Sequence, residues 1–83
     1  MRVDVALHEL RLYKSRSQAQ AAIAAGRVQL NGRRTKPSHE VRVGDRLTFT
    51  GDAGSRTVEI LELPGRSLSK EAAKALVREV GEP

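Results

Sequence analysis

The hydrophobic pattern of this 83-residue chain changes its period at Gly26. Before that glycine, apolar residues recur every three to four positions, the spacing that places side chains on one face of an α-helix. After it, Val28 and Leu30 alternate with a polar residue and lead to Asn31-Gly32, the pair favoured in a two-residue type I′ hairpin turn. The chain is therefore predicted to begin with helices and to continue as an antiparallel sheet.

Two short helices are predicted before the hairpin. The first covers residues 4–13, with Asp4 as its N-cap. The second begins at Ser15, which can form a capping box with Gln18, and it ends at Gly26, where a left-handed residue stops the helix. Because the connection between the helices is so short, its residues are expected on an exposed corner.

After the hairpin turn, the pattern predicts a small sheet. Residues 33–36 form a polar returning arm at the rim of this sheet. Alternating apolar residues predict two more strands, around residues 47–49 and over residues 57–63. Residues 51–54, which contain two glycines, are predicted to be the loop between them.

The last segment predicts a third helix. Ser69 can cap it, apolar residues keep helical spacing as far as Val80, and Gly81 stops it. The predicted fold class is α+β, with two short N-terminal helices packed on a small, mostly antiparallel sheet and a C-terminal helix added. We expect residues 1–63 to form one domain that includes the sheet, and residues 64–83 to be a helical tail packed on it.

Positive charge is concentrated in the first half of the chain. Between Leu10 and His39 there are seven cations and no carboxylate. Residues 1–50 carry a net charge of +6, whereas residues 51–83 carry −1. Like charges on one small surface repel, so stability alone favours mixed charges. The one-sign segment therefore predicts a docking surface for a polyanion, with nucleic acid, an anionic membrane and an acidic protein as the candidates.

Composition argues against several classes of function. The chain has no cysteine and two histidines, so neither disulfides nor a metal site is predicted. Tyr13 and Phe49 are its only aromatic residues, which argues against an aromatic stacking platform for single-stranded nucleic acid. No apolar run approaches the ~20 residues of a membrane span, and a chain of this size has little room for a deep catalytic pocket. A soluble, cytoplasmic protein without membrane contact is expected.

One string of residues is more specific than these patterns. It consists of Ser15-Arg16, Gly26-Arg27-Val28, Leu30-Asn31-Gly32, Lys36-Pro37-Ser38 and Gly44-Asp45. In this order and spacing it resembles the S-four RNA-binding domain, also called the αL motif, over roughly residues 1–50. The resemblance implies that the two helices and the hairpin form an L-shaped surface that docks on folded RNA.

The tail extends the resemblance to small stand-alone members of the family. Arg56-Thr57-Val58 and the Ala-rich segment that starts at Glu71 are similar to a heat-shock ribosome-associated form and to a form of bacterial ribosome quality control. The chain length suits the second form and the Lys-Pro-Ser string suits the first, so both stay open. The resemblance implies binding to ribosomal RNA of the large subunit while it still holds peptidyl-tRNA, with contacts to rRNA and tRNA.

Residue types and resemblance together give a set of candidate RNA-binding residues on the helical corner, the hairpin and the chain start. They are Arg2, Lys14, Ser15, Arg16, Gln18, Arg27, Asn31, Arg33, Arg34 and Lys36. Arg16 can hold a phosphate with two parallel N–H bonds beside the free N–H groups of a helix start. For some members a structural role competes: Ser15 and Gln18 as a capping box, Asn31 as the turn residue, and Arg2 as a frayed terminal charge.

Two other functions are weighed. One is a module related to RNA-modifying enzymes acting on tRNA or rRNA, but such enzymes keep catalysis in a separate domain, and the chain shows no Ser-His-Asp set, paired carboxylates or Gly-rich phosphate loop. The other is a DNA-binding or protein-interaction module, although the second helix offers few base-reading groups beyond Gln18 and Gln20. The prediction is a non-catalytic RNA-binding protein, monomeric and without cofactor or metal.

Overall fold

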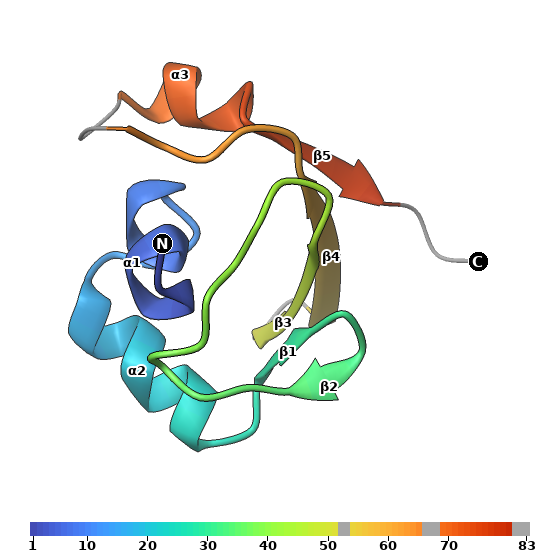
Figure 1. Cartoon of the computed structure of the whole chain (residues 1–83). Coiled ribbons are helices and arrows are strands. Elements are labelled where there is room, and N and C mark those ends of the chain that lie inside the picture. Colours follow the sequence, from blue (N-terminus) through green and yellow to red (C-terminus); the bar gives the residue numbers. More distant parts are fainter. Residues whose placement is uncertain (52–53, 66–68, 81–83) are drawn as a thin grey trace.

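The computed structural model, drawn in Figure 1, describes residues 1–51, 54–65 and 69–80. Its elements in chain order are α1 (Val3–Glu9), α2 (Arg16–Ala24), β1 (Val28–Leu30), β2 (Arg33–Arg34), β3 (Arg46–Gly51), β4 (Gly54–Ile60), α3 (Lys70–Lys74) and β5 (Val77–Val80). The predicted α+β class is confirmed, because helices precede and follow the strands of one sheet. The prediction of a loop over residues 51–54 is wrong at its two ends, because Gly51 belongs to β3 and pairs with Gly54 of β4. Residues 52–53 and the predicted helix stop at Gly81 lie outside the described residues.

The five strands form one sheet in the order β2-β1-β3-β4-β5, and each neighbouring pair is antiparallel. The register places Val28 beside Phe49 and Leu30 beside Leu47. Because side chains alternate along a strand, these residues point to the same face of the sheet. The α1 and α2 helices lie on one side of the sheet, and the other side stays open (Figure 1).

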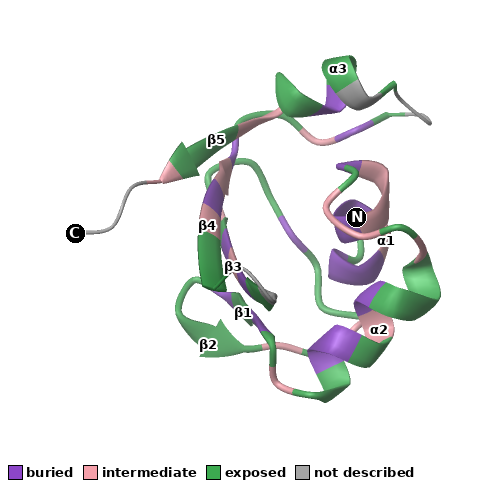
Figure 2. Ribbon diagram, turned by 180° about the vertical axis from the view of Figure 1, so that it is seen from behind, coloured by how far each residue is buried: buried purple, intermediate pink, exposed green. Residues whose placement is uncertain are grey.

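The core lies between the helices and the covered face of the sheet. Figure 2 shows the buried residues on the inner sides of α1 and α2 and along the middle strands. Leu7 and Leu47 are the largest fully buried side chains, and both belong to a single aliphatic cluster. Each such side chain stabilises the fold by about 1.5–3 kcal/mol. The core thus fixes how α1, α2 and the strands sit relative to one another.

The first helix ends earlier than predicted. α1 stops at Glu9, whereas the sequence predicts a helix that runs to residue 13. The backbone leaves the helix through Arg11, a left-handed residue with φ 63°. The N–H of Arg11 donates to His8 (2.9 Å) and that of Leu12 to Leu7 (3.0 Å), the pair of bonds of a Schellman motif.

The second helix ends in the same way, with glycine in the left-handed position. Gly26 has φ 78°, and its N–H donates to the carbonyl of Ile23 at 3.0 Å. The N–H of Arg27 donates to the carbonyl of Ala22 at 2.9 Å. The predicted helix stop at Gly26 is therefore confirmed, and β1 begins two residues later, at Val28.

The predicted cap of the first helix is wrong. The N-cap of α1 is Arg2, in an extended conformation, and its side chain makes no capping bond. Asp4 instead lies within the first turn, where its carboxylate accepts from the N–H of Val5 at 2.8 Å and is fully buried. The chain start is held by backbone bonds to a neighbouring segment, in which the N–H of Val3 donates to the carbonyl of His39 at 2.7 Å. Asp4 therefore does not cap the helix, and its carboxylate is available for contacts with other side chains.

The C-terminal helix is shorter than predicted. Ser69 does cap α3, accepting from the N–H of Ala72 at 3.2 Å, but α3 ends at Lys74. The residues predicted to continue the helix form β5, which pairs with β4 so that Val80 lies beside Thr57. Pairing supplies hydrogen bonds to an edge of β4 that would otherwise lie open, and valines favour a strand. The division into residues 1–63 and 64–83 stays a prediction.

Candidate nucleic-acid interface

The start of α2 is built as the sequence predicts. Ser15 is the N-cap, in an extended conformation, and its Oγ accepts a hydrogen bond from the N–H of Gln18 at 3.1 Å. Arg16 is the first residue of the helix, and Lys14 lies exposed in the preceding connection. The first turn of α2 contains no acidic residue. Backbone N–H groups and two cations therefore meet at a helix start, an arrangement suited to a phosphate.

Asp4 links the two helices through its buried carboxylate. Arg2 donates to it twice, from Nε at 3.1 Å and from Nη2 at 3.0 Å. Gln20 of α2 donates from Nε2 at 2.8 Å to Oδ2, and the Nε of Arg16 lies 3.6 Å from the same oxygen. One carboxylate thus orients two of the predicted RNA-binding arginines. Sequence reasoning missed this network, because nothing local relates Gln20 to a residue sixteen positions earlier.

The charge of Asp4 is stabilised in spite of burial. Burial alone raises the pKa of a carboxyl group, but hydrogen bonds from Gln20 and Arg2 outweigh it and hold the pKa of Asp4 below its usual value of 3.8. The side chains of Arg2 and Arg16 remain 44% and 51% exposed. Because two guanidinium groups share one negative charge, the cluster keeps a net positive charge that an incoming phosphate can reach.

The hairpin turn confirms the type I′ prediction. Both central residues have positive φ, 53° at Asn31 and 82° at Gly32. The side-chain amide of Asn31 donates to Asp45 at 3.2 Å, and its oxygen accepts from the N–H of Arg46 at 2.9 Å. These internal bonds favour the structural role of Asn31, and its contact with RNA stays a prediction. Asp45 also accepts from the N–H of Arg42 at 2.9 Å, so it shapes the Gly-Asp turn as expected.

The returning arm of the hairpin lies next to the end of α2. Arg33 and Arg34 form β2, an exposed edge strand, as the predicted polar rim requires. The segment from Arg34 to Pro37 lines one groove together with Ile23 and Ala24 of α2. The guanidinium of Arg34 lies over Gly26, where an added Cβ would come within 3.2 Å of its Nη2. The structure therefore brings α2 and the cations of the hairpin to a common groove.

Arg27 lies on the other flank of α2. It lines a depression together with Tyr13, Gln18 and alanines of α2. Burial raises the pKa of Tyr13 above its usual value of 10.0, although the charge of Arg27 acts in the opposite direction. The aromatic ring therefore packs into the molecule while Arg27 stays exposed.

Most of the predicted cations have no carboxylate nearby. Within the part of the chain that the structure describes, five of them make no ion pair within 4.0 Å: Lys14, Arg27, Arg33, Arg34 and Lys36. Each of the five is exposed. We use the name basic surface for these five residues together with Arg2 and Arg16. Among the described residues, the ion pairs of this set are those of Arg2 and Arg16 with Asp4.

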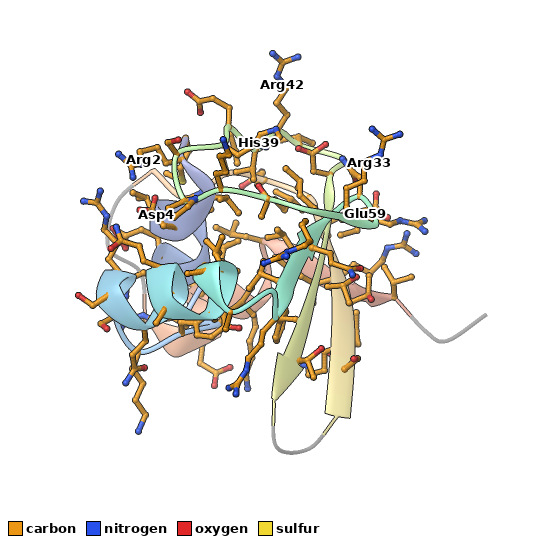
Figure 3. The ribbon with its side chains drawn as sticks, turned by 90° about the horizontal axis from the view of Figure 1, so that it is seen from below. Arg2, Asp4, Arg33, His39, Arg42 and Glu59 are labelled. Carbon is orange, nitrogen blue, oxygen red and sulfur yellow. The ribbon has the colours of Figure 1, made fainter. Side chains whose placement is uncertain are left out.

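Sequence reasoning also missed Arg42. Figure 3 shows Arg2, Arg42 and Arg33 along one side of the molecule, with His39 between the first two. Arg42 is exposed and lies in the segment that connects the hairpin to β3. A weak signal was present, because Arg42 is a further cation in the basic half. Glu40 and Asp45, which flank it in the sequence, concealed that signal.

Other kinds of site find little support in the described residues. Over residues 1–51, 54–65 and 69–80, no three acidic, histidine or cysteine side chains are grouped so that they could hold a metal ion. In the same ranges no helix is long and apolar enough to cross a bilayer. The Nδ1 of His8 is buried without a hydrogen-bond partner among these residues.

The structure combines a helical corner and a cationic hairpin on one small sheet. The S4 domain model matches residues 1–47, more than half of the chain. The chain therefore belongs to the S4 domain family, and the resemblance noted in its sequence is confirmed.

Two relatives with curated names cover nearly the whole chain. It is 37% identical over 73 residues to the RQC P-site tRNA stabilizing factor of Bacillus subtilis, covering 88% of this chain and 85% of the relative. It is 33% identical over 82 residues to Heat shock protein 15 of Escherichia coli, covering 99% of this chain and 62% of the relative. The chain thus spans less than two thirds of the length of the heat-shock relative.

Solved structures agree with the fold. Heat Shock Protein 15 of Vibrio cholerae, described as trimeric, superposes with a TM-score of 0.91 at 32% identity, over 96% of this chain and 81% of that one. The solution structure of a hypothetical protein, HP1423, superposes with a TM-score of 0.82 at 27% identity over the whole of both chains. The monomeric state expected for this chain stays a prediction.

Proposed function

We propose that this protein binds structured ribosomal RNA through its basic surface, on a large ribosomal subunit that still carries peptidyl-tRNA. In this role it acts without catalysis, in the cytoplasm, during the rescue or quality control of stalled translation. The names of its relatives support this proposal, since one is a P-site tRNA stabilizing factor and the other a heat shock protein. The proposal includes the ten candidate residues as contacts to RNA. It also includes contact with tRNA.

The observation that carries the proposal is the cluster around Asp4. If these arginines served only stability, we would expect each of them to pair with a carboxylate of its own. Arg2 and Arg16 instead share the single carboxylate of Asp4. Their guanidinium groups are oriented yet about half exposed. Oriented guanidinium groups hold phosphates with parallel N–H bonds, and orientation in advance lowers the entropy lost on binding.

The arrangement suits recognition of RNA shape. Contacts to phosphates and 2′-hydroxyl groups dominate the binding of folded RNA, and they need rigidly placed cations more than aromatic platforms. The basic surface supplies such cations from α2 and the hairpin, which the common core holds in place. Each phosphate that it neutralises steepens the plot of the logarithm of the binding constant against the logarithm of the salt concentration by about 0.9. We therefore expect steep salt dependence.

Sedimentation tests the proposal. Tagged chain in bacterial extract is separated on a sucrose gradient at low and moderate salt, and its position is compared with those of free subunits and ribosomes. We expect the chain to travel with the large subunit and Arg16→Ala to shift it toward the top. The matched control is Arg78→Ala, which removes an exposed arginine from β5. Equal displacement of both variants, or migration of the wild type away from ribosomal fractions, contradicts the proposal.

A further inference from the structure

A groove lies between the α1–α2 connection and the β4–β5 pair, and none of the ten candidate residues lines it. Its volume is about 460 Å³, within the range of sites that hold a small ligand. Leu10, Leu12, Val58 and Val77 supply apolar lining. In the register Val58 lies beside Leu47 and Arg56 beside Phe49, so the groove opens on the face of the sheet that carries the core.

Three cations line the same groove against one carboxylate. Arg11, Arg56 and Lys74 come from three separate elements, and Glu79 is the acidic member of the lining. The C-terminal part of the chain carries net negative charge, so a cationic groove here is not a consequence of composition. An apolar lining with cations beside it fits a ligand that is flat and apolar in one part and anionic in another.

Arg56 is held in place at one wall. Its guanidinium carbon lies 5.2 Å from the centre of the Phe49 ring, and Glu79 accepts from its Nε at 3.2 Å and from its Nη2 at 2.7 Å. The side chain is nevertheless 56% exposed. A guanidinium plane fixed in this way is a surface on which a nucleobase stacks, as aromatic rings do in other RNA-binding proteins.

Arg11 occupies a position where stability favours glycine. α1 and α2 end in the same turn, and the left-handed residue is Gly26 in α2 but Arg11 in α1, with φ 63°. A side chain in this conformation strains the backbone. Backbone strain of this kind concentrates at functional sites. The side chain of Arg11 lines the groove.

The groove continues into the basic surface. Arg11 and Leu12 also line a second depression, which they share with Tyr13 and Lys14. Tyr13 in turn borders the depression that contains Arg27. Shared lining residues therefore make three depressions neighbours, from β5 past the α1–α2 connection to α2. A strand of RNA bound at the helical corner can enter the groove without leaving a positively charged path.

We propose that this groove binds an unpaired nucleotide of the RNA that the basic surface docks on. The base lies against the apolar lining and the guanidinium of Arg56, and the flanking phosphates lie at Arg11 and Lys74. This inference rests on the proposed function and extends it, since the protein then recognises an unpaired segment next to a folded one. RNA fits better than an acidic peptide because the groove neighbours depressions that residues of the basic surface line.

NMR locates the binding. The isotope-labelled full chain is titrated with a ten-nucleotide oligouridylate and, separately, with a blunt RNA duplex. We expect oligouridylate to shift the amide signals of Leu12, Val58 and Val77, and the duplex to shift those of α2 and the hairpin. If oligouridylate shifts only α2 and the hairpin, or a ten-residue glutamate peptide shifts the groove signals equally, the inference is overturned.

A pair of charge-matched variants gives the second readout. Lys74→Gln removes a groove cation, and Arg78→Gln removes a cation that β5 carries outside the groove, ion-paired with Glu59. We expect Lys74→Gln to weaken oligouridylate binding three- to tenfold and to lower the salt slope by about 0.7, the value for one phosphate of a single strand. Arg78→Gln should change the affinity less than twofold, and equal losses overturn the inference.

Ribosome binding separates this inference from the function on which it rests. If Arg16→Ala releases the chain from large subunits while oligouridylate leaves the groove signals unmoved, only the nucleotide groove is overturned. If the wild-type chain does not travel with ribosomal particles, the proposed function fails first. A melting curve for each variant identifies any loss of binding that follows from unfolding.

Discussion

The cations of the hairpin and the cations of β4 and β5 lie in opposite electrostatic surroundings. On β4 and β5, Arg56 pairs with Glu79 at 2.7 Å and Arg78 pairs with Glu59 at 2.5 Å. On the hairpin, neither Arg33 nor Arg34 makes an ion pair within 4.0 Å among the described residues. The two regions belong to one sheet and differ little in exposure, so burial does not explain the difference.

The comparison distinguishes charged side chains that pair with one another within the fold from charged side chains that are available to bind a partner. Exposed ion pairs stabilise a protein by about 0–1 kcal/mol, and they cancel the field that repels like charges. The arginines of β4 and β5 form such ion pairs, whereas most cations of the basic surface do not form them among the described residues. The α1–α2 corner is intermediate, because Asp4 neutralises one of two arginines and orients both. Each prediction below tests this division.

The largest effect is expected at Asp4. Asp4→Ala leaves the donors of Arg2 and Gln20 without their acceptor. We therefore expect the free energy of unfolding to fall by about 3 kcal/mol. This value is near the lower end for a broken buried ion pair, because the arginines are half exposed. Urea denaturation measures this loss. In Asp4→Asn, RNA affinity should also fall although the net charge becomes more positive. Glu59→Gln adds the same charge on β4 and should not weaken binding; stronger binding by Asp4→Asn breaks the comparison.

The same carboxylate makes stability depend on pH. The pKa of Asp4 is lowered in the folded state, so its contribution is fully present above the usual value of 3.8 and is lost as the pH falls through the lower folded value. We expect the difference in unfolding free energy between the wild type and Asp4→Asn to be constant from pH 7 to about pH 5 and to shrink below about pH 4. A difference that grows in acid contradicts the role given to Asp4.

A methyl group at Gly26 tests the groove between α2 and the hairpin. Gly26→Ala forces a side chain into a residue with φ 78° and brings its Cβ within 3.2 Å of Arg34, so we expect a loss of about 1.5–2 kcal/mol and weaker RNA binding. Gly54→Ala in β4 is the matched control, because its φ is 103° and nothing lies within 4 Å of the added atom. It should lose stability without losing affinity. Equal effects on RNA binding remove the argument for Arg34.

Arginine-to-alanine substitutions compare the two regions directly. Arg16→Ala removes a half-exposed guanidinium of the basic surface, and we expect RNA affinity to fall about tenfold, or about 1.4 kcal/mol. Arg78→Ala removes an arginine that is already paired with Glu59 and should change affinity less than twofold. Filter binding to large-subunit RNA at two salt concentrations measures both. Similar losses in both variants indicate a nonspecific field in place of a defined surface.

The smallest effect is expected at Arg11. Arg11→Gly relieves the left-handed strain at the end of α1, so we expect the free energy of unfolding to rise by up to about 1 kcal/mol. Affinity for oligouridylate should fall at the same time, since the groove loses a cation. Thermal denaturation and fluorescence anisotropy measure the two quantities. A variant that gains stability and keeps its affinity shows that Arg11 has no part in the groove.

Features that depend on neighbouring residues were predicted well. The Ser15 cap, the left-handed stop at Gly26 and the Asn31-Gly32 turn each depend on hydrogen bonds and φ values within a few residues. The order of helices and strands from α1 to α3 was also predicted, because periodicity is a local signal. Placement of the candidate residues on an exposed corner and an edge hairpin followed from these elements.

Features that depend on distant partners were missed. Asp4 was predicted as a cap because its sequence neighbours permit that role, while its actual partner Gln20 lies one helix away. The apolar spacing near Val80 suits a helix, yet the segment forms β5 because β4 offers an open edge. The groove beside Arg56 was invisible for the same reason, since its walls come from three separate segments.

The amino-acid order alone settled the Asn31-Gly32 turn, the starts of α2 and α3 and the segregation of positive charge, because these follow from torsion preferences and from which residues are neighbours in the chain. Packing settled which arginines share Asp4, which strand completes the sheet, and where an apolar groove opens beside cations. Those outcomes depend on how the chain buries its aliphatic side chains. No window of neighbouring residues contains that information.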